Sequence, residues 1–102
     1  MKDVSKIADN LLNFIAESYK ELYTIEIDTI LHVYLMKLIV DADISEYSEK
    51  WKKVMLSIHE FLKPYNLNKE EEIEVIVSAI NLIQFLEISE SLIESKRFDV
   101  GS

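Results

Sequence analysis

The chain has 102 residues, no cysteine and a formal net charge of −8 at pH 7. This length predicts a single helical domain over residues 1–102, and the lack of cysteine excludes disulfides, thiolate metal sites and thiol nucleophiles. The acidic balance argues against binding of nucleic acid, because lysine and arginine side chains supply most of the attraction to a polyanion.

The N-terminal residues 1–9 mix charged and apolar side chains and do not form a secretory signal. The longest apolar run, residues 30–40, makes about 16 Å of helix, whereas a membrane span needs roughly 30 Å. We therefore expect a soluble, cytoplasmic protein with no membrane partner. The preference for Ile, Leu, Lys, Glu, Tyr and Asn is typical of AT-rich genomes, such as those of many crenarchaea and their viruses, for which the host cytoplasm would be the location.

Apolar residues recur every three or four positions over residues 3–23, which predicts an amphipathic helix. Residues 23–28 contain β-branched side chains and two candidate N-caps, Thr24 and Asp28, so we expect a break there. One continuous helix through residue 41 is the alternative, since neither glycine nor proline enforces a stop.

The run over residues 30–40 is interrupted only by His32 and Lys37. At about 100° per residue its apolar side chains point all the way round the axis, so this helix must be covered on every side. We expect it at the centre of the fold, covered by the rest of the chain or by a second copy.

Two capping signals place the remaining helices. Asp43 with Glu46 predicts a capping box for a third helix over residues 44–62, which Pro64 ends. Asn68 with Glu71 predicts the same reciprocal cap at the start of the fourth helix.

The apolar face of the fourth helix changes direction beyond Gln84. Phe85, Ile88 and Leu92 point roughly where Glu74 and an asparagine pointed before. Either the helix breaks near Gln84, or a continuous helix of about 25 residues buries its two halves against different neighbours. The second alternative implies a partner.

The segment from Glu70 to Glu74 contains a Glu-Glu-x-x-Glu pattern, formed by Glu70, Glu71 and Glu74. It resembles the first half of the motif with which all-helical nucleotide pyrophosphohydrolases of the MazG type hold magnesium. The resemblance implies that these carboxylates are metal ligands. The second half departs from the family, because Glu90 stands where the motif Glu-x-x-Asp ends in Asp. Acidic side chains at a helix start are also explained by capping and the helix dipole.

Asp28 and His32 lie one helical turn apart and could share a hydrogen bond or hold a metal between them. Two ligands do not complete a site, so we expect a hydrogen bond to Asp28 or water. His59 is expected on the surface of the third helix. No cofactor and no catalytic residue is predicted.

Together these patterns predict an all-α, four-helix bundle-like domain with a central, fully apolar second helix, which forms a homodimer. We expect a small acidic interaction module without enzymatic activity that binds another protein as an adaptor, inhibitor or regulator, with imitation of nucleic acid as one hypothesis for its acidic surface. The alternative is a magnesium-dependent nucleotide pyrophosphohydrolase-like enzyme that uses the acidic cluster at the start of the fourth helix. The residues expected at the partner interface are Val33, Met36, Val40, Phe85, Ile88 and Leu92.

Overall fold

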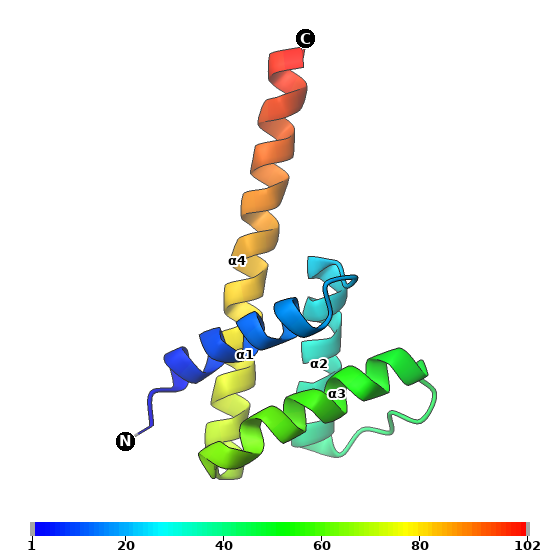
Figure 1. Cartoon of the computed structure of the whole chain (residues 1–102), viewed down its shortest axis with the longest axis vertical. Helices are drawn as coiled ribbons and strands as arrows, with labels where there is room; N and C mark the ends of the chain where they lie inside the picture. The colour runs from blue at the N-terminus through cyan, green and yellow to red at the C-terminus, as the bar shows by residue number, and fades with distance from the viewer. Residues whose placement is uncertain (1, 102) are drawn as a thin grey trace.

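The computed structural model describes the backbone of residues 2–101 and the side chains of residues 2–90 and 92. Over these residues the chain is all-helical and has no strand, and its helices pack together (Figure 1). The prediction of an all-α fold with four packed helices is confirmed. The elements in chain order are α1 (Val4–Ser18), α2 (Thr24–Val40), α3 (Glu49–Leu62), the short 3-10 helix η1 (Lys63–Tyr65) and α4 (Lys69–Gly101).

α1 begins after Asp3, whose carboxylate accepts a hydrogen bond from the Lys6 amide at 3.1 Å. One face of α1 is buried, with Ile7, Leu11 and Ile15 each at most 5% exposed. The helix ends at Ser18, five residues before the predicted end.

The connection between α1 and α2 covers residues 19–23, so the break lies a few residues before the predicted stretch 23–28, and the alternative of one continuous helix is wrong. Tyr19 leaves helical geometry, and its hydroxyl lies 2.6 Å from Ser57 Oγ on α3. Tyr23 rather than Thr24 precedes α2, and its amide donates to Glu26 Oε1 at 3.2 Å. The hydrogen bond between Tyr19 and Ser57 and the cap formed by Tyr23 and Glu26 thus fix the turn between α1 and α2, although this segment has neither glycine nor proline.

The buried side chains of α2 all lie at or before Tyr34. Ile27, Ile30, Leu31 and Tyr34 are buried, whereas Met36, Ile39 and Val40 are 49%, 48% and 60% exposed. The helix ends where Asp41 adopts a left-handed conformation with φ of 50°. The last turn of α2 therefore carries an apolar surface that the described part of the chain leaves open.

α3 begins five residues later than predicted. Ser48 caps it by accepting from the Trp51 amide at 3.2 Å, while Asp43 instead accepts from the Ser45 amide within the preceding loop. The predicted capping box at Asp43 is wrong because that carboxylate closes a local turn. At the other end α3 stops at Leu62, next to Pro64 as expected.

α4 begins with the predicted reciprocal cap, which is confirmed. The Glu71 amide donates to Asn68 Oδ1 at 2.8 Å, and the Asn68 amide donates to Glu71 Oε1 at 2.9 Å. The helix continues past Gln84 without a break and packs against both α1 and α2. The side chains buried in this contact are Val75, Ile76, Ala79, Ile80 and Ile83.

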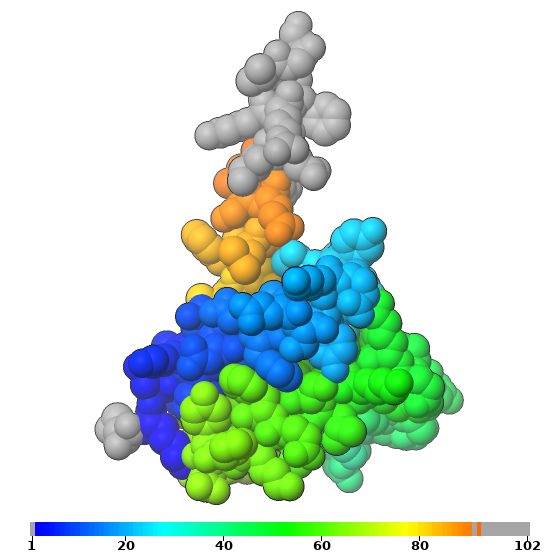
Figure 2. Space-filling model, viewed as in Figure 1, coloured from blue at the N-terminus to red at the C-terminus, as the bar shows by residue number. Residues whose placement is uncertain are grey.

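Beyond this packed half, α4 leaves the other helices and projects from them (Figures 1 and 2). Its 33 residues set the longest dimension of the molecule, 51 Å. Among the described residues no helix combines the length and the apolar composition needed to cross a membrane.

Candidate interaction surfaces

The projecting half of α4 carries three exposed apolar side chains, Phe85, Ile88 and Leu92, which we call the arm stripe. They are 68%, 60% and 59% exposed. Their spacings of three and four residues place them on one side of the helix, as in the seam of a coiled coil. Leu86, which follows Phe85 in the chain, is also exposed, at 49%. The structure thus brings together the three α4 residues that the sequence nominated for a partner interface.

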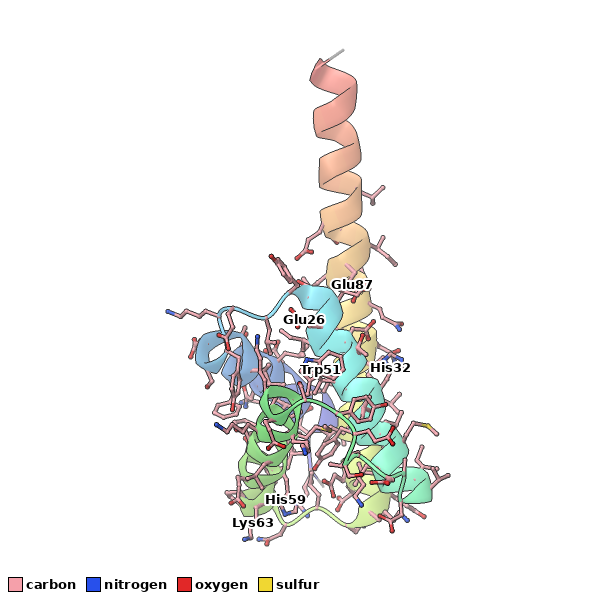
Figure 3. The ribbon with its side chains drawn as sticks, turned by 90° about the vertical axis from the view of Figure 1, so that its right-hand side faces the viewer. Glu26, His32, Trp51, His59, Lys63 and Glu87 are labelled. Atoms are coloured by element: carbon pink, nitrogen blue, oxygen red, sulfur yellow. The ribbon has the colours of Figure 1, made fainter. Side chains whose placement is uncertain are left out.

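The opposite side of the same segment lies against the start of α2. Thr24 Oγ1 donates to Glu90 Oε1 at 3.1 Å, and Glu87 lies next to Asp28. Figure 3 shows Glu87 beside the end of α2 that carries Glu26, where α4 leaves the body. The hydrogen bond between Thr24 and Glu90 therefore ties the base of the arm to α2, and the arm stripe points away from α2.

Glu87 and Asp28 form a carboxyl pair. Asp28 Oδ1 and Glu87 Oε1 are both buried, and neither has a hydrogen-bond partner among the described residues. Burial, and then the neighbouring Asp28, raise the pKa of Glu87 above its ordinary value of 4.5. A proton held between the two groups would supply the missing donor.

His32 completes this group without forming a metal site. Its Nδ1 lies 2.8 Å from the backbone oxygen of Asp28 and 3.2 Å from Asp28 Oδ1. No set of three histidine, cysteine, aspartate or glutamate residues in the described part of the chain is arranged to hold a metal ion. His32 therefore acts here as a hydrogen-bond partner of its own helix.

The α2 residues nominated for the interface lie at the other end of the molecule. α2 runs antiparallel to α4, because Thr24 contacts Glu90 whereas Tyr34 donates to Glu72 at 2.8 Å. Eighteen residues separate the two glutamates, which is roughly 27 Å along a helix.

Met36 and Val40 follow Tyr34 and are exposed, and Val33 is half-buried. The six nominated residues thus form two separate groups, one on the arm and one at the end of α2.

An open groove of about 760 Å³ lies beside this second group, between α2 and α3. Its apolar lining includes Leu38, Ile44 and Met55, and Leu56 on its edge is 59% exposed. Leu56 was not among the interface residues predicted from the sequence. The signal was present, because Leu56 falls among charged residues outside the apolar stripe of α3.

Within the acidic cluster at the start of α4, Glu71 is engaged in capping. Glu71 accepts from the Asn68 amide and pairs with Lys2 Nζ at 3.4 Å, while Glu70 and Glu74 are exposed. The Asn68 amide is the main cause that lowers the pKa of Glu71. These contacts are those of a helix start.

Comparison of the chain with known protein families, curated proteins and solved structures finds no match.

Proposed function

We propose that this protein is a non-enzymatic helical interaction module, acting as an adaptor, inhibitor or regulator, and that it pairs with a second copy through the arm stripe. The observation that carries the proposal is the exposure of Phe85, Ile88 and Leu92 along one side of a helix that projects from the body.

The energetic reason is the apolar area left in water. Burial of apolar surface contributes about 25 cal/mol per Å², so three large side chains at 59% to 68% exposure favour association. Monomeric proteins rarely carry contiguous apolar patches of this kind without a use for them. A second copy offers the same stripe, and two such stripes meet across a two-fold axis with their three- and four-residue spacings in register.

The base of the arm supports this role. The hydrogen bond from Thr24 Oγ1 to Glu90 Oε1 holds the base of the helix against α2, so the arm stripe is presented before a partner arrives. A surface ordered in advance loses less conformational entropy on association. Met36 and Val40 lie outside this contact, at the end of α2 that is remote from the arm. This end of the molecule therefore remains free to bind another protein.

Sedimentation velocity at micromolar concentration tests the pairing. The unaltered chain should sediment as a dimer, and Phe85→Glu or Ile88→Glu should sediment as a monomer with the same far-ultraviolet circular dichroism. Gln84→Glu places the same charge on an exposed position of the same helix and should remain dimeric. A monomeric unaltered chain, or a dimer that both stripe variants leave intact, would show that the arm stripe is not the interface.

A further inference from the structure

We infer that the groove between α2 and α3 is a second binding site, which accepts an acidic amphipathic helix of a partner protein. The groove lies at the end of α2 remote from the arm, so this inference does not depend on pairing through the arm stripe. Its lining comes from the last turns of α2, the following loop, α3 and the first residue of α4.

The floor and edges of the groove are apolar. Leu38, Ile44 and Met55 form part of the floor, while Val40 and Leu56, at its edges, are 60% and 59% exposed. An apolar cleft between two helices is the usual receptor for the apolar face of a third helix. Because the edges stand open to solvent, the groove suits a ligand that lies along it and presents one side.

Lysine side chains surround this apolar surface. Lys37, Lys52 and Lys69 line the groove, against a single acidic residue, Asp41. The chain as a whole has 19 acidic residues and 11 basic ones. The lining of the groove, in contrast, has more basic residues than acidic ones. A ligand with acidic side chains beside its apolar face complements this charge.

Two of the lysines are held in place by their own neighbours. Lys37 Nζ lies 2.6 Å from Asp41 Oδ1, and Lys52 Nζ lies 2.7 Å from Glu49 Oε1. Lys52 Nζ also donates to the backbone oxygen of Ser45 at 3.4 Å. These ion pairs order the two ammonium groups, and Lys69, which has no ion pair within the described residues, adds a further positive charge to the lining.

The arm of a second copy does not provide the required ligand. Its acidic residues Glu87 and Glu90 lie against α2, on the opposite side of α4 from the arm stripe. An arm placed in the groove by its stripe would bring neither carboxylate next to the lysines. The chemistry of the groove therefore indicates a different protein, whose helix carries glutamate or aspartate on both flanks of its leucine or isoleucine residues.

Fluorescence anisotropy with three synthetic probes tests this inference on the full chain. The first probe is a labelled amphipathic helix with leucine on one side and glutamate on its flanks. The second has lysine in place of each glutamate, and the third contains the residues of the first in scrambled order. We expect the first probe to bind at least tenfold more tightly than either of the others.

Groove variants with matched controls locate the binding. Leu56→Glu should weaken binding of the acidic probe at least tenfold, because it introduces a like charge into the apolar edge. Lys69→Glu should weaken it by about two- to fivefold without loss of folding, since a negative charge at the start of α4 is favoured by the helix dipole. Lys53→Glu, on α3 but outside the groove lining, and Phe85→Glu on the arm should each leave the affinity unchanged.

Several outcomes would overturn the inference: no binding of the acidic probe, equal binding of the lysine or scrambled probe, or an affinity that Leu56→Glu leaves intact. Loss of binding in Phe85→Glu would place the probe on the arm. Oleate provides the small-molecule comparison, and an apolar anion that binds in the groove while the acidic helix does not would assign the groove to a lipid.

Discussion

Glu87 of α4 faces Asp28 of α2 at the point where α4 leaves the body, and each presents a buried oxygen that has no hydrogen-bond partner within the described residues. Two facing carboxylates repel each other and are costly to bury together. His32 on α2 and Glu90 on α4 are the other titratable groups that act on Glu87. The contact between the arm and α2 is therefore less favourable when Glu87 is ionised.

Glu87→Gln should stabilise the protein at neutral pH. Burial and Asp28 raise the pKa of Glu87 above 4.5 in the folded state, so its contribution to stability is fully present below about pH 4.5 and is lost as pH rises through the raised pKa. Glutamine stays uncharged and can donate to Asp28 at every pH. Urea denaturation should show a higher midpoint for the variant at about pH 7 and a smaller difference near pH 4.

Glu74→Gln is the matched control for this experiment, because Glu74 is exposed on the same helix. The control should leave the midpoint close to that of the unaltered chain at both pH values. The urea midpoint of Glu87→Gln, measured relative to that of the unaltered chain, is expected to be higher at about pH 7 than near pH 4. The reverse order would contradict a raised pKa of Glu87.

Tyr34→Phe should lower the free energy of unfolding by about 1–2 kcal/mol, because it leaves Glu72 without its buried donor. The Tyr34 hydroxyl donates to Glu72 Oε1 at 2.8 Å, and the tyrosine is only 6% exposed. Tyr47→Phe, at a 40% exposed tyrosine, is the control and should have little effect. Chemical denaturation measures both values, and equal stability of the two variants would show that the hydrogen bond contributes nothing.

The Tyr34 hydroxyl should also resist ionisation. Burial raises its pKa, and the contact with Glu72 raises the pKa further. Exposed tyrosines ionise near pH 10 and change the ultraviolet absorbance there. In a titration of the folded protein, this change should be as large in Tyr34→Phe as in the unaltered chain, because Tyr34 does not contribute to it.

Calorimetric titration with Mg²⁺ and a nucleoside triphosphate should give no heat and no turnover, because Glu71 is engaged with Asn68 and Lys2 in capping α4. This experiment separates the interaction module from the nucleotide pyrophosphohydrolase that the Glu-Glu-x-x-Glu pattern resembles. Binding heat that disappears in Glu70→Gln or Glu74→Gln would favour the enzyme, since both positions are exposed and neither takes part in the cap.

Parts of the candidate surfaces could be predicted from the sequence. The change of face beyond Gln84 correctly grouped Phe85, Ile88 and Leu92, because side-chain direction along a helix follows from spacing alone. The sequence could not show that Met36 and Val40 lie at the other end of the molecule, since this depends on the antiparallel packing of α2 on α4. For the same reason it missed the groove, whose lysines come from three different helices.

The sequence by itself determined what depends on neighbours within a few residues. The helical class, the cap formed by Asn68 and Glu71, and the end of α3 next to Pro64 all follow from local hydrogen bonding and backbone geometry. These interactions need no distant partner, so a spacing of three or four residues is enough to predict them.

Tertiary structure decided those features for which contacts between distant segments outweigh local preference. The end of α1 follows the contact of Tyr19 with Ser57, and α4 stays continuous although its apolar face rotates. The pairing of Asp28 with Glu87 likewise joins residues far apart in the chain. Which side chains become buried depends on how the helices cross, and the apolar pattern of one helix does not specify its neighbour.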